Sequence, residues 1–139
     1  MNWKLILMLS LFGLAMGLAT VFFIPSNIEA AFWLPIFLLC AFLIARGTSG
    51  NAFLQGVFLG LANSVWITAA HVLFFARYIA AHAQEATMMQ MMPLANHPRL
   101  MMIFTGPVVG VISGIVIGAF ALVASRFIKP RVRLAGQPS

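Results

Sequence analysis

The chain has 139 residues, of which 63% are hydrophobic and only 7% charged, and its mean hydropathy is +1.04. These values lie outside the range of soluble globular domains and indicate an integral membrane protein. The net charge of +6 does not indicate nucleic-acid binding, because the strongest basic cluster is a short tail after the last apolar run rather than a solvated basic face.

Four apolar segments are long enough to cross the hydrocarbon core of a bilayer, which takes about 20 residues. They predict an all-α membrane protein, a four-transmembrane-helix bundle with spans at about 5–24, 27–45, 52–76 and 100–125. The rest of this single domain is an outer segment, 77–99, and a basic tail, 126–139.

The first two segments meet at a tight connection. Pro25 ends the first segment, and Ser26 with Glu29 predicts a capping box at the start of the second. A cleaved signal peptide is the alternative interpretation of the first segment, but its apolar run continues to Ile24 and is longer than a usual signal core. The single cysteine, Cys40, lies inside the second segment and therefore cannot form an intramolecular disulfide.

The third segment follows a candidate N-cap, Ser49 or Asn51, and carries the intramembrane histidine. At 100° per residue, Ser64, Thr68 and His71 share one face with Asn63 at its edge, and polar groups at this depth need partners. We therefore expect a polar ligand pocket formed by Asn63, Ser64, Trp66, Thr68 and His71. The alternative is that these groups hydrogen-bond to neighbouring helices and only hold the bundle in register.

The outer segment is rich in methionine and histidine. If the third helix continues past Arg77, one amphipathic stripe runs along it, which suits an extracytoplasmic helix lying over the bundle mouth. The stripe consists of Tyr78, His82, Glu85, Met89 and Met92. Because thioether sulfur is a ligand for soft metals such as Cu(I), the candidate copper ligands are His82, Met88, Met89, Met92 and His97. The alternative is an adaptable methionine contact surface.

Glycine recurs every four residues in three segments, most regularly in the fourth, which begins near Pro98. The repeats are Gly13 and Gly17, Gly56 and Gly60, and Gly106, Gly110, Gly114 and Gly118. In lipid, small residues at this spacing let helix backbones approach closely. We expect these helix-packing faces to meet within the bundle, and a homodimer through the fourth helix is the alternative.

The distribution of Lys and Arg predicts the orientation, because cytoplasmic loops are rich in these residues. With four spans, one side of the membrane receives Lys4, Arg46, Arg126, Lys129, Arg131 and Arg133. The other side receives only Arg77 and Arg99. Both termini are therefore predicted to be cytoplasmic, and the outer segment extracytoplasmic.

Within the spans, no nucleophile and base lie at a catalytic spacing, so we expect no enzyme activity and no cofactor. The chain length invites comparison with small multidrug transporters, but the glutamate in the first helix of that family has no counterpart here. The stretch NSVWITAAHVLFFARY, residues 63–78, resembles small four-helix bacterial inner-membrane proteins of an uncharacterised family. That resemblance implies a multi-pass protein of the bacterial inner membrane without implying an activity.

The leading prediction is a non-enzymatic structural or accessory subunit that contacts lipids and other membrane proteins through its glycine faces and outer segment. The alternative is a small transporter or ligand-binding protein that uses the pocket around His71, or a protein that binds copper outside the cytoplasm. The two classes differ in where the polar face of the third helix points, into a cavity or into packed side chains.

Overall fold

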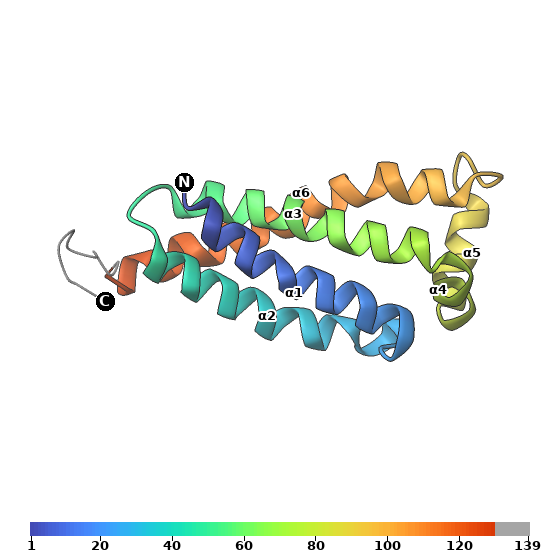
Figure 1. The fold of residues 1–139 in the computed structure, drawn as a ribbon, viewed down its shortest axis with the longest axis horizontal. Coiled ribbons are helices and arrows are strands. Elements are labelled where there is room, and N and C mark those ends of the chain that lie inside the picture. Colours follow the sequence, from blue (N-terminus) through green and yellow to red (C-terminus); the bar gives the residue numbers. More distant parts are fainter. Residues whose placement is uncertain (130–139) are drawn as a thin grey trace.

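The computed structural model describes residues 1–129 and is helical throughout apart from short connections (Figure 1). The helices are α1 (Trp3–Phe22), α2 (Ser26–Gly47), α3 (Ala52–Leu73), α4 (Phe75–Ala81), α5 (Ala83–Met91) and α6 (Pro98–Phe127). Helices α1, α2, α3 and α6 are long and apolar enough to cross a membrane, which confirms the predicted all-α class with four candidate spans. The end of the predicted basic tail, including Arg131 and Arg133, lies outside the described residues.

Helix α3 is the centre of the bundle. It packs along α1 on one side and along α6 on the other, whereas α2 packs mainly against α6. The start of α1 and the end of α6 lie at one end of the bundle, and α4 and α5 lie across the opposite end (Figure 1). The two short helices therefore cover one mouth of the bundle.

Close backbone contact joins α3 to α6 in an antiparallel register of small residues. The facing pairs are Gly56 with Gly118, Gly60 with Gly114, Ser64 with Gly110, and Thr68 with Gly106. A Cβ atom added at Gly114 would stand 2.7 Å from the carbonyl oxygen of Val57, so a side chain there would push the helices apart. On α1, an added Cβ at Gly13 would stand 2.8 Å from the Cα of Asn63, and Gly17 likewise packs on α3. The glycine faces are thus occupied within one chain.

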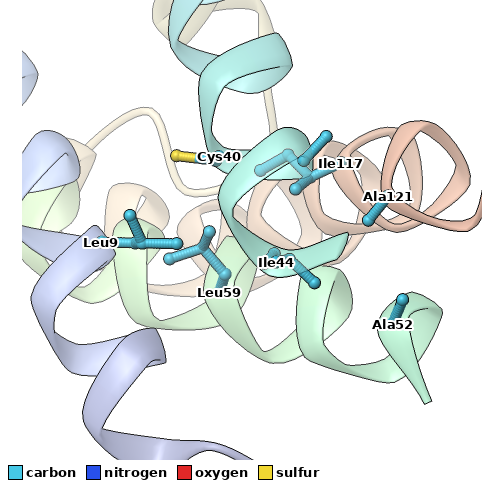
Figure 2. Close-up of a cluster of buried hydrophobic side chains, with 8 residues drawn as sticks. Leu9, Cys40, Ile44, Ala52, Leu59, Ile117 and Ala121 are labelled. Atoms are coloured by element: carbon cyan, nitrogen blue, oxygen red, sulfur yellow. The ribbon is translucent and has the colours of Figure 1, made fainter. Parts of the chain in front are cut away.

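An apolar core fills the end of the bundle nearest the termini (Figure 2). Its buried members are Leu9, Cys40, Ala41, Ile44, Ala52, Leu59, Ile117 and Ala121. Cys40 and Ile44 attach α2 to the paired helices α3 and α6 here, and both are fully buried. In lipid, where apolar surface gains little from leaving the solvent, such contacts stabilise the bundle mainly through close packing.

The third helix does not continue past Arg77, which was the condition for a single stripe along the outer segment. Helix α3 ends at Leu73, because Phe74 leaves helical geometry with φ −103° and ψ 33°. A second break lies at His82, with φ −126° and ψ 68°, so the outer segment contains two short helices instead of one. Within the predicted stripe, Tyr78 and His82 are buried and Glu85 is half-buried, which places this part of the stripe against the bundle.

Helix starts follow the sequence signals at two of three positions. The Asn51 side chain accepts a hydrogen bond from the Leu54 N–H at 3.1 Å, and Pro98 lies in the first turn of α6, as predicted. The predicted capping box at Ser26 is wrong, because Ser26 is already the first helical residue and no side chain caps α2. The Glu29 carboxylate instead accepts a hydrogen bond from the Trp33 indole at 2.9 Å.

Candidate functional site

A cavity of about 620 Å³ lies between α2, α3 and α6, and the side chains that close one end come from α4 and α5. Helix α2 lines it with Glu29, Ala30, Trp33, Leu34 and Phe37, and α3 with Asn63, Ser64, Ile67, Thr68 and His71. Helix α6 contributes Met102, Thr105, Gly106, Val109, Gly110 and Ser113, and the short helices add Tyr78 and Met89. This volume is within the range of sites that bind drug-sized molecules, and most of the surface that lines the cavity is apolar.

Small residues explain why side chains do not fill this cavity. Gly106 and Gly110 on α6 meet Thr68 and Ser64 on α3, and neither pair carries enough side-chain volume to reach α2. Helix α2 is attached through the apolar core at the opposite end of the bundle. The residues that let α3 and α6 pack closely therefore also form the wall of the cavity.

Four of the five predicted pocket residues line the cavity: Asn63, Ser64, Thr68 and His71. Trp66, the fifth predicted pocket residue, does not line it. Its indole N–H donates to the Ser10 hydroxyl of α1 at 3.2 Å. Trp66 precedes Thr68 by two positions, which is a rotation of about 200° around the helix axis, so the two side chains point in nearly opposite directions.

The amide of Asn63 is the most unusual polar group in the wall. The residue is 3% exposed, and neither its Oδ1 nor its Nδ2 has a hydrogen-bond partner among the described residues. By contrast, the Ser64 hydroxyl donates to the Leu61 carbonyl of its own helix at 2.8 Å. The Asn63 Oδ1 lies against α1, where a Cβ atom added at Gly13 would stand 2.7 Å from it. A buried polar group without a partner costs about 1–3 kcal/mol.

Three aromatic rings stack at the closed end of the cavity, with Tyr78 in the middle. The His71 ring lies 4.0 Å from the Tyr78 ring and the His82 ring 4.3 Å from its other face, both with interplanar angles of 21°. The stack links α3 to the short helix α4 and to the break before α5. It therefore fixes the position of the helices that cover this end of the bundle.

Both histidines of the stack form hydrogen bonds. The Thr20 hydroxyl lies 3.0 Å from the Met16 carbonyl oxygen and 2.9 Å from His71 Nε2, and so connects α1 to α3. The Nδ1 of His82 lies 2.9 Å from the Tyr78 carbonyl oxygen and donates to it, because a carbonyl oxygen can only accept. The Nε2 of His82 is buried and has no partner among the described residues.

Both carboxylates of the chain act on Tyr78. Burial raises the pKa of the Tyr78 phenol above its ordinary value, and the negative charges of Glu85 and Glu29 raise it further. The chain contains one Tyr and two acidic residues, so this end of the cavity gathers all three. The raised pKa keeps the phenol neutral at physiological pH, and it retains its proton as a hydrogen-bond donor.

The predicted copper ligands do not line a common cavity. His82 is buried against Tyr78, and Met89 lines the large cavity, whereas Met88 and Met92 are exposed. His97 lines a separate pocket at the start of α6. Within residues 1–129, no three His, Cys, Asp or Glu side chains are placed to hold a metal ion. A copper site built on methionine sulfur stays a prediction.

Glu29, Trp33 and Tyr78 also line the cavity, although none of them was predicted as a pocket residue. A signal was present for the first two, because a Glu four residues before a Trp places both side chains on one helix face. Tyr78 gave no comparable signal, since its position depends on the break after α3. Comparison with protein-family models, curated proteins and solved structures gives no match to this chain.

Proposed function

We propose that this protein binds a small, mostly apolar molecule in the cavity between α2, α3 and α6, as a ligand-binding protein or transporter without chemical turnover. The observation that carries this proposal is a cavity of about 620 Å³ whose mostly apolar surface includes the polar side chains of Ser64, Thr68 and His71. An apolar cavity with a few polar groups is the usual form of a small-molecule site.

An accessory subunit is the second candidate, supported by a different surface. The glycine faces are occupied inside the bundle, so they are not available to a partner protein. Met88, Met91 and Met92 are exposed at the mouth of the bundle, and flexible methionines suit adaptable protein contacts. Capture of one defined membrane protein by a photo-cross-linker at Met91, together with no ligand binding by the isolated protein, would favour this candidate.

We further infer that the protein lies in a bacterial inner membrane with its termini in the cytoplasm. Lys4 and Arg126 lie at the terminal end of the bundle, and Arg77 belongs to α4 at the opposite end, which agrees with the rule that basic residues stay in the cytoplasm. In this orientation, α4, α5 and the closed end of the cavity lie on the extracytoplasmic side.

Filling the cavity tests the proposed function. Val109 and Val108 are adjacent, similarly exposed valines of α6, but only Val109 lines the cavity. We expect purified wild-type protein to bind the neutral fluorescent probe N-phenyl-1-naphthylamine saturably, Val109→Trp to weaken that binding about tenfold or more, and Val108→Trp to leave it unchanged. Absence of saturable binding by the wild type, or equal loss in both variants, would overturn the proposal.

A further inference from the structure

We propose that the molecule bound in this cavity is a lipophilic cation, an apolar molecule whose positive charge lies against the carboxylate of Glu29. This inference rests on the proposed function and adds the chemical class of the ligand.

Among residues 1–129, Glu29 is the one acidic residue of the cavity wall, and neither Lys nor Arg lines the cavity. Its Oε1 accepts the Trp33 indole N–H at 2.9 Å, which orients the carboxylate and leaves Oε2 available. Among the described residues, Glu29 forms no salt bridge. A carboxylate without a cationic partner, beside an apolar space of low dielectric, attracts a positive charge and repels an anion.

The basic residues at this end of the bundle are engaged elsewhere. Arg77 lies over the Phe22 ring, with its guanidinium carbon 4.8 Å from the ring centroid. Arg99 lies over the Phe75 ring at 5.4 Å. Neither lines the cavity, so neither offers a bound anion a partner there.

The aromatic side chains of the wall suit a cation with apolar substituents. Trp33 and Phe37 form a tilted pair on α2 with ring centroids 5.5 Å apart, and Tyr78 lies at the closed end. Aromatic faces attract cations through their electron-rich centres, and Trp does so most strongly. The wall therefore combines apolar contact with a preference for positive charge.

A second carboxylate adds negative potential at the same end. Among the described residues, Glu85 Oε2 is buried without a hydrogen-bond partner, and the Glu85 charge reaches Tyr78 as that of Glu29 does. The two carboxylates at this end of the bundle thus favour a ligand that brings positive charge.

Two ions of nearly the same size and shape, tetraphenylphosphonium and tetraphenylborate, separate charge recognition from apolar binding. Equilibrium dialysis with the full chain in an uncharged detergent should give tetraphenylphosphonium an affinity about tenfold or more above that of tetraphenylborate. Glu29→Gln, which keeps an acceptor for Trp33, should remove most of this difference. Glu29→Asp, which retains the negative charge, should keep it.

The outcomes separate this inference from the proposed function. The proposal of a lipophilic cation is overturned if the wild type binds the two ions equally or if Glu29→Gln keeps the preference. In that case, binding of the neutral probe that depends on Val109 would still support the cavity as a ligand site. Loss of binding of all three probes by the wild type overturns both. The comparison of the two ions uses the unmodified chain, so it decides the question even if a variant fails to fold.

Discussion

Replacing Gly114 by Ala tests whether close contact between α3 and α6 stabilises the bundle. The added Cβ would stand 2.7 Å from the Val57 carbonyl oxygen and 2.9 Å from the Val57 Cα, about 0.7 Å short of the 3.4 Å at which ordinary contact begins. Both atoms belong to the backbone of α3 and cannot move aside by a rotamer change. The helices must therefore separate locally, and a gap of about 0.5–1 Å removes a quarter to a half of each dispersion contact along the interface.

Overpacking of this kind costs about 1–3 kcal/mol, and Ala returns up to about 1 kcal/mol through its higher helix propensity. We expect the free energy of unfolding of Gly114→Ala to fall by about 1–2 kcal/mol in mixed-micelle denaturation followed by tryptophan fluorescence. Gly50→Ala is the control, because the nearest atom to its added Cβ lies 3.9 Å away. Wild-type stability in Gly114→Ala would show that the α3–α6 contact is looser than described.

The remaining predictions concern ionisation and topology. Because Tyr78 is the single tyrosine, its ultraviolet absorbance reports one residue, and its raised pKa should delay tyrosinate formation to well above pH 10. Removing a negative charge favours ionisation of the Tyr78 phenol, so Glu85→Gln should lower the midpoint of its titration, while burial keeps that midpoint above pH 10. A titration midpoint near pH 10 in the wild type would contradict the buried environment of Tyr78. Topology can be tested with a membrane-impermeant maleimide and single-cysteine variants in a Cys40→Ala background. In intact cells the reagent should label Met91→Cys, and it should label Phe127→Cys only after the membrane is permeabilised. The reverse pattern would refute the inferred orientation.

Local patterns predicted the parts of the fold that depend on few residues. The glycine repeat from Gly106 to Gly118 indicated a close helix contact, because small residues every four positions create a flat face whatever the partner. The partner itself, α3, depends on how four spans assemble, and the sequence left a second copy of the chain as an alternative. Asn51 was predictable as a candidate cap because its hydrogen bond is also local: the side chain bonds to a backbone N–H within the first turn of α3.

The candidate site was predictable on one helix and not across several. Helical spacing alone placed Asn63, Ser64, Thr68 and His71 near one face of α3. The position of Trp66 near the middle of the third segment suggested it as a pocket residue. Its side chain instead points towards Ser10 of α1 and not into the cavity. The roles of Glu29 and Tyr78 depend on the approach of α2 and on the break at Phe74, and neither follows from local propensity.

The two ends of the bundle differ in what fills the space beside the paired helices α3 and α6. At the terminal end, α2 inserts Cys40 and Ile44 next to Ile117, and the space is closed. Towards the other end, α2 presents Ala30 and Leu34 to the cavity, and the small residues of α6 leave the space open. A ligand bound in the cavity, as proposed, would supply the packing contacts for α2 that Cys40 and Ile44 supply at the terminal end. Because a ligand that binds only the folded state stabilises that state, its binding would strengthen the attachment of α2 where the chain itself provides least packing.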